Sequence, residues 1–117
     1  MKQNISELLD AKNAMILEGR IVDATNQYFS SEATTTDFDG TLTSGKAEML
    51  NKMEGFAGAI AKVNGITLHH SSVGDNVSFA EFTFDFDMKD GSHILWHEII
   101  RSVWEDGEIV NEQYFKG

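Results

Sequence analysis

Three carboxylates, Asp37, Glu98 and Glu112, occupy positions from which a small protein could perform acid–base chemistry. Asp37 lies near the end of a threonine-rich segment, residues 33–38, which favours a β-strand. Glu98 and Glu112 fall in two later predicted strands. A carboxylate on an apolar pocket wall has its charged form disfavoured, so its pKa rises toward values useful in general acid or base catalysis. All three are therefore candidate catalytic residues, and the alternative for Asp37 is a solvated carboxylate at a strand end.

Glu98 shares one face of its predicted strand with Trp96 and Trp104, because side chains alternate along a strand. If that face points inward, Glu98 is a buried acid between two indole rings, and both tryptophans line a ligand pocket. If it points outward, Glu98 forms an ion pair with Arg101 or Lys116. A shift of one residue in register reverses the assignment, and the outer ion pair is the more ordinary interpretation.

Glu112 lies in the last predicted strand, residues 108–115, and shares a face with Val110 and Tyr114. If this face also points inward, Glu112 and Tyr114 lie opposite Glu98. Two pocket carboxylates in different environments suit acid–base work. The outer ion pair with a basic side chain is again the alternative for Glu112, and Tyr114 is a candidate ligand-binding residue.

Phenylalanines form a row at alternate positions of the strand predicted over residues 77–88, namely Phe82, Phe84 and Phe86. Packing against the helices explains such a row in most proteins. The same row could line the apolar part of a ligand pocket, so Phe82 and Phe84 are candidate ligand-binding residues.

Four histidines, His69, His70, His93 and His97, lie on predicted strands. His93 and His97 share a face, and one of the adjacent pair His69 and His70 could converge with them. A metal site needs three or four converging ligands. Hydrogen-bonded wall or surface histidines are the commoner case, so we expect no metal.

The composition limits the partners. The chain has 117 residues, which fits one domain over residues 1–117, and its formal net charge is −10. Nucleic acid and anionic membranes are polyanions, so this charge disfavours both. The chain lacks cysteine, which excludes disulfides and thiolate chemistry. With no recognisable signal peptide or membrane-length apolar run, a cytoplasmic location is expected, and no cofactor fingerprint is present.

Periodicity predicts helices first and strands after. Apolar spacing and breaker residues give helices over residues 5–18, 21–29 and 46–63, the third capped by Ser44 and ended by Asn64-Gly65. Strands are predicted over residues 33–38, 66–73, 77–88, 93–105 and 108–115. The order ααβαββββ indicates an α+β fold with three helices on an antiparallel sheet. Strands this long must twist, so the sheet should curve around a cavity.

Two segments carry a resemblance to a known family. The first is the run from Tyr28 to Gly40 followed by Ser44-Gly45-Lys46-Ala47-Glu48, and the second is Trp104-Glu105-Asp106-Gly107-Glu108-Ile109. With the element order, they make the chain resemble the NTF2-like superfamily of cone-shaped α+β barrels. That superfamily includes ketosteroid isomerase and the SnoaL-like polyketide cyclases. The resemblance covers nearly the whole chain.

The resemblance implies a role for particular residues. Asp37 matches the isomerase's general base, and Tyr28 and Asn13 fall on ligand-binding positions. The isomerase's oxyanion-hole tyrosine matches Asn13, and its second aspartate falls near Ile99 or Ile100, neither of which supplies the same donor. Steroid isomerisation by that mechanism is therefore not expected.

The function implied is a pocket protein for a small apolar or amphipathic molecule. If it is an enzyme, it transfers a proton on an enolisable substrate without a cofactor, as isomerases and cyclases do. The alternatives are ligand binding without chemistry and a scaffold role as a homodimer. The family commonly pairs through outer sheet faces, where Phe79, His97 and Val103 are candidate contacts. A hydrolase of the limonene-epoxide type is a weaker idea, because only Arg101 is available on the sheet.

Overall fold

The computed structural model describes residues 4–117 and consists of three helices and one six-stranded sheet. The helices begin and end at Ile5–Leu17 (α1), Ile21–Tyr28 (α2) and Lys46–Gly58 (α3). The strands are Phe29–Thr36 (β1), Leu42–Ser44 (β2), Ile60–Gly74 (β3), Val77–Met88 (β4), His93–Glu105 (β5) and Glu108–Lys116 (β6). No helix among the described residues is long and apolar enough to cross a membrane. The predicted α+β class and element order are confirmed, with β2 as an additional short strand.

The strands are ordered β2-β1-β6-β5-β4-β3 across the sheet. Neighbouring strands are antiparallel except β1 and β6, which run parallel, so the sheet is mixed and the expectation of a purely antiparallel one is wrong at this pair. The parallel pair follows from the connection, because α3 and three long strands separate β1 from β6 and bring the chain back in the same direction.

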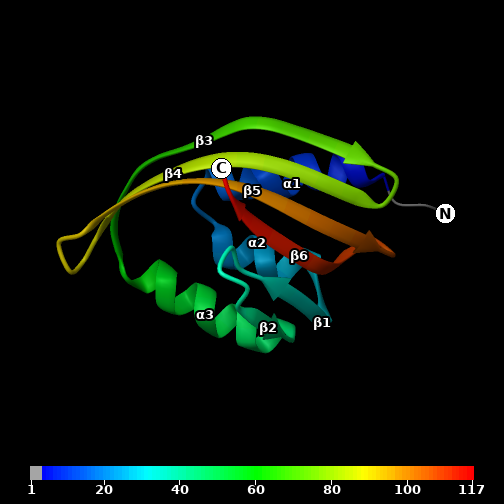
Figure 1. The fold of residues 1–117 in the computed structure, drawn as a ribbon, viewed down its shortest axis with the longest axis horizontal. Coiled ribbons are helices and arrows are strands. Elements are labelled where there is room, and N and C mark those ends of the chain that lie inside the picture. Colours follow the sequence, from blue (N-terminus) through cyan, green and yellow to red (C-terminus); the bar gives the residue numbers. More distant parts are fainter. Residues whose placement is uncertain (1–3) are drawn as a thin grey trace.

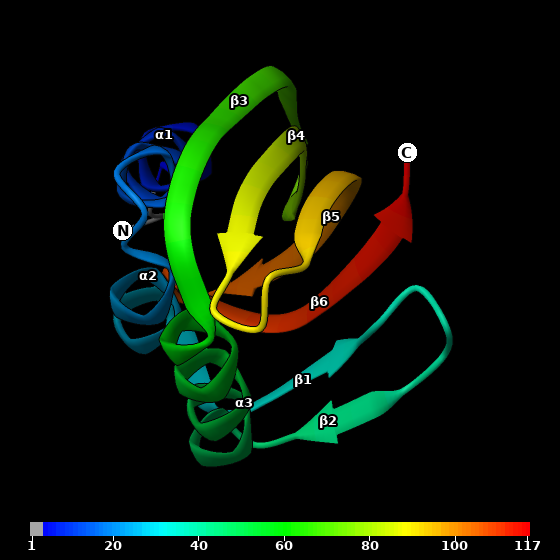
Figure 2. The same ribbon diagram turned by 90° about the vertical axis from the view of Figure 1, so that its left-hand side faces the viewer.

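The sheet arches over the helices (Figure 1), and the same curvature is visible end-on in Figure 2. Three register shifts interrupt the pairing of β3 with β4. Each shift adds local twist to the strand and helps to bend it. The concave face therefore points toward the helices, as the length of the strands predicted.

The third helix is shorter than predicted. It ends at Gly58, not near residue 63, and β3 begins at Ile60. The sequence around Ile60 has helical apolar spacing, but β4 continues to Met88 and pairs with Ile60, so residues 60–65 are used to extend the sheet. The expected cap is also wrong, because Ser44 lies in β2 and Gly45 occupies the N-cap without a side-chain hydrogen bond.

The inner face of β4 has the predicted parity. Ser78, Ala80, Phe82, Phe84 and Phe86 are buried. The four apolar residues of this set pack with residues of α1, α2 and β5 in a single core cluster. Burial of this continuous apolar row supplies much of the driving force that holds the helices on the sheet.

A bulge in β6 changes which of its side chains face inward, compared with the strict alternation that the sequence predicted. Val103 pairs with Asn111 and Trp104 pairs with Ile109, which leaves Val110 as the extra residue. Ile109 is fully buried and lies on the inner face. Val110 therefore does not share a face with Glu112, contrary to the prediction, because the bulge inserts one residue between the two inward positions.

Candidate functional site

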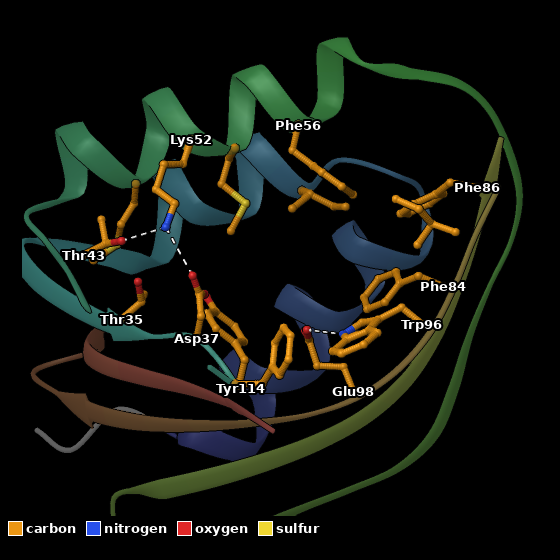
Figure 3. Close-up of a pocket in the computed structure, with 15 residues that line it drawn as sticks. Thr35, Asp37, Thr43, Lys52, Phe56, Phe84, Phe86, Trp96, Glu98 and Tyr114 are labelled. Carbon is orange, nitrogen blue, oxygen red and sulfur yellow. Dashed lines mark hydrogen bonds and ion pairs between the residues drawn. The ribbon is translucent and has the colours of Figure 1, made fainter. Parts of the chain in front are cut away.

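A cavity of about 640 Å³ lies between the concave face of the sheet and helix α3 (Figure 3). Most of its wall is aromatic or aliphatic, with a few polar side chains. Its lining residues are Ile21, Thr35, Asp37, Phe38, Thr43, Met49, Lys52, Met53, Phe56, Phe84, Phe86, Ile94, Trp96, Glu98 and Tyr114. The size and the mixture of apolar wall and few polar groups are typical of small-molecule sites.

Asp37 follows β1 and begins a turn, in which its backbone N–H donates to the Thr41 carbonyl (2.9 Å). Its side chain is 36% exposed and lies 3.3 Å from the ammonium of Lys52. Lys52 also donates to the hydroxyl of Thr43 at 2.9 Å. Asp37 is therefore an ion-paired carboxylate on the cavity wall, at the position that the sequence predicted.

Glu98 lies on β5 and faces the cavity, so the inward orientation holds. The indole N–H of Trp96 donates to its Oε2 at 2.8 Å. Burial raises the pKa of the Glu98 carboxyl to about 7, with the negative charges of Glu112 and Asp37 adding to the rise, although the indole hydrogen bond opposes it. The carboxyl therefore changes protonation near neutral pH. It forms no ion pair with Arg101 or Lys116 within residues 4–117.

Glu112 points inward but does not line the cavity; it lies in a buried polar network next to it. Its Oε2 accepts from the ammonium of Lys12 (3.2 Å) and the hydroxyl of Ser102 (2.6 Å), and its Oε1 accepts from the hydroxyl of Tyr114 (2.7 Å). The side chains of Lys12 and Glu112 are 3% and 4% exposed. The ion pair of Glu112 is therefore an inner one with α1, and the alternative of an outer ion pair is not observed among the described residues.

Tyr114 lines the cavity from β6, and Figure 3 shows it between Asp37 and Glu98. Burial raises the pKa of its phenol well above the ordinary value, and the charge of Glu112 and the hydrogen bond to it act in the same direction. Tyr114 therefore stays neutral at physiological pH and links the cavity to the buried network.

Aromatic side chains form the wall beside Glu98. Phe84 and Trp96 line it as predicted. Phe38 lies at the rim, 59% exposed, with its ring centroid 4.9 Å from that of Trp96. The ammonium of Lys116 lies 5.9 Å from the centroid of the same indole. This wall offers a flat apolar surface to a ligand ring.

Four predicted ligand-binding residues, Asn13, Tyr28, Phe82 and Trp104, are buried in the core and do not line the cavity. The Trp104 indole donates to the Ser78 hydroxyl at 2.9 Å and packs edge-on against the Tyr28 ring. Asn13 and Tyr28 belong to α1 and α2, and these helices cover the part of the inner sheet face that carries Phe82 and Trp104. Alternation alone could not distinguish this covered part from an open pocket.

The sequence reasoning missed the contribution of α3. Met49, Lys52, Met53 and Phe56 all line the cavity from this helix. The helix was predicted to pack on the sheet, but none of its residues was named as a pocket residue. Lys52, one turn from Met49 and Phe56, was a signal that this face meets a polar site.

The histidines lie on the outer sheet face or at its edge. His93 contacts Asp85, His97 contacts Glu81, and His69 contacts Thr83 through its ring nitrogen. Asp85 raises the pKa of His93 through this hydrogen bond. Within the part of the chain that the structure describes, no group of three or more His, Cys, Asp or Glu side chains could hold a metal ion.

No family model and no curated protein matches the sequence. Solved structures match its fold. A protein from Mesorhizobium loti described as a SnoaL-like polyketide cyclase superposes with a TM-score of 0.85 at 18% identity, over 97% of this chain and 99% of that one.

Two further structures show how varied such proteins are. A protein of ketosteroid isomerase-like fold from Catenulispora acidiphila, in complex with trimethylamine, has a TM-score of 0.76 at 16% identity, covering 95% of this chain and 85% of its own. A protein from Streptomyces galilaeus described as a hydroxylase has a TM-score of 0.77 at 14% identity, covering 96% and 87%. Identities this low establish the fold alone. The chain therefore has the NTF2-like fold that SnoaL-like polyketide cyclases and ketosteroid isomerase-like proteins share, as its sequence pattern indicated.

Proposed function

We propose that the cavity binds a small apolar or amphipathic molecule and transfers a proton on an enolisable substrate, without a cofactor. One observation carries the proposal. Two carboxyls in contrasting environments, the ion-paired Asp37 and the partly buried Glu98 without an ion pair among the described residues, line one aromatic cavity. Such a contrast separates an acid from a base in the same site. Neighbours in fold described as polyketide cyclases add support.

Asp37 is the proposed base and Glu98 the proposed acid. The C–H bond next to a substrate carbonyl breaks, its proton passes to the Asp37 carboxylate, and its electron pair moves toward the carbonyl oxygen. The protonated Glu98 donates a hydrogen bond to that oxygen as negative charge develops. Return of the proton from Asp37 to another carbon of the enolate completes an isomerisation.

The experiment follows exchange of the α-protons of 2-tetralone, an apolar aromatic ketone, for deuterium in D₂O by NMR. We expect Asp37→Asn to abolish protein-dependent exchange, because an amide cannot accept the proton. Asp39→Asn is the matched control, since Asp39 lies in the same turn, is exposed and does not line the cavity. Equal exchange by wild type and Asp37→Asn would remove Asp37 from the mechanism.

Ligand binding without chemistry is the competing outcome of the same experiment. In that case 2-tetralone raises the melting temperature of the wild type, as any ligand specific for the folded state does, while exchange stays at the rate of buffer alone. The missing isomerase-type donors at Asn13, Ile99 and Ile100 favour this outcome.

A homodimer through the outer sheet face is a second proposal. Phe79, Leu95 and Phe115 are 41%, 66% and 45% exposed on β4, β5 and β6. These three strands are neighbours in the sheet, since Phe115 of β6 pairs with Ile99 of β5 and Ile99 pairs with Glu81 of β4. Large apolar side chains on neighbouring exposed strands are typical of an interface. Light scattering should give twice the chain mass at micromolar concentration, and Leu95→Glu should give a monomer. A monomeric wild type would exclude the dimer.

A further inference from the structure

The hydroxyl of Tyr114 already donates its one hydrogen to another side chain of the protein. This hydrogen is donated to Oε1 of Glu112 at 2.7 Å, away from any ligand. A phenol has one hydrogen to donate and lone pairs that accept. Since Tyr114 lines the cavity, any ligand group that reaches its oxygen must be a donor.

The direction of that hydrogen bond is fixed by the partners of Glu112. Its other oxygen accepts from Lys12 and Ser102, and the pair with Lys12 is almost completely buried. An ionised carboxylate accepts and cannot donate. Glu112 therefore requires the hydrogen of Tyr114, and a rotation that turned this hydrogen into the cavity would break a charge-assisted bond.

Other donors of the cavity are also in use. The indole N–H of Trp96 is donated to Glu98, and Lys52 donates to both Asp37 and Thr43. In Figure 3 the Lys52 and Thr43 side chains gather at the end of the cavity away from Trp96 and Glu98. The Trp96 and Lys52 donors are therefore engaged within the protein, which leaves the Tyr114 oxygen as an acceptor beside the aromatic wall.

We propose that the cavity selects ligands that carry a hydroxyl on an aromatic or alicyclic body, a phenol or an enol, and that this hydroxyl donates to the Tyr114 oxygen. Glu112 is the positioning residue that sets this preference from outside the cavity. An enolisable compound is then held in its enol form, in which the oxygen donates. The proposal rests on the cavity being the ligand site proposed above, and it does not require turnover there.

The experiment compares 2-naphthol with 2-methoxynaphthalene by titration calorimetry. The two molecules share a ring system and an oxygen at the same position, but the ether carries a methyl group in place of the hydroxyl hydrogen and cannot donate. A hydrogen bond of ordinary net strength predicts about tenfold tighter binding of the naphthol by the wild type. Tyr114→Phe should remove the preference, and Tyr28→Phe should retain it, because Tyr28 lies outside the cavity wall. Equal affinities in the wild type, or a preference unchanged in Tyr114→Phe, would overturn the proposal.

The double variant Lys12→Met with Glu112→Gln tests the positioning role and leaves no buried charge unpaired. The introduced amide can donate to the Tyr114 oxygen, so the phenol hydrogen becomes free to turn toward the ligand. We expect the ether to gain affinity relative to the naphthol, reducing the preference about threefold or more. A folded double variant that keeps the full preference would contradict the role of Glu112.

The result separates this inference from the proton transfer. A preference for naphthol in a protein that shows no exchange of 2-tetralone protons removes only the proposed chemistry. Exchange without such a preference removes only the inference.

Discussion

Replacement of Glu98 by Gln should change the pH dependence of stability. The free energy of unfolding of the variant, relative to that of the wild type, should be higher at alkaline pH than at acid pH. The pKa of this carboxyl rises from 4.5 to about 7 on folding. Between these values the folded state binds more protons than the unfolded state, so the wild type loses stability as the pH rises from about 4.5 through 7. At 1.36 kcal/mol for each tenfold change in proton affinity, the full loss is roughly 3 kcal/mol. Part of the carboxyl reaches solvent, so we expect about 2 kcal/mol.

The assay is urea unfolding of wild type and Glu98→Gln at pH 5 and pH 8. The difference between the two proteins at each pH removes the contribution of all other titrating groups. Glu105→Gln is the matched control, because Glu105 is an exposed acid at the end of the same strand. If the stability of the wild type and that of Glu98→Gln change with pH in the same way, the carboxyl is not buried without an ion pair at this position, and the reasoning is refuted.

Three further changes test the network and the fold. Lys12→Met should lower the free energy of unfolding, measured in urea, by about 3 to 5 kcal/mol, because Glu112 is left buried without its cation. The double variant Lys12→Met with Glu112→Gln should recover part of this loss. Equal losses in the single and the double variant would contradict the argument. Asn13→Leu should raise the melting temperature, because both amide atoms of Asn13 are buried without a partner among the described residues; a lower melting temperature would indicate that the amide is bound by water. Deletion of Val110 should leave a native circular dichroism spectrum, because Val110 is the unpaired residue of the bulge and regular alternation without it keeps Ile109 opposite Trp104 and Glu112 opposite Ser102; an unfolded spectrum would show that the bend at this bulge is required for folding.

The fold around the cavity was predictable from the sequence to a large extent, because it depends on the periodicity of apolar residues. The alternation of β4 gave the correct buried face, and turn residues such as Asp106 and Gly107, which have positive φ, marked the hairpin ends. The errors lie where periodicity is ambiguous. Residues 60–65 have helical spacing but pair with β4, and this pairing depends on the length of a partner strand that local pattern cannot reveal.

The site was less predictable, because it depends on small shifts between elements. Asp37, Glu98 and Tyr114 line the cavity, which for Glu98 is the less ordinary of the two orientations considered, whereas Trp104 is a core residue on the same face of β5 as Glu98. The two differ only in what covers them. Glu112 was placed on the correct face although Val110 was not, since the bulge between them had no local signal such as glycine.

The cavity itself follows from the way α3 is connected. The helix joins β2 and β3, the two edge strands of the sheet, and single residues, Gly45 and Ala59, form the connections. Thirteen helical residues span about 20 Å, and six paired strands measure about 24 Å across. A straight helix fixed at both edges of a curved sheet of similar width cannot follow the curve, so a space remains between them. The topology therefore creates the hollow, and the side chains of β5, β6 and α3 determine which molecule it accepts.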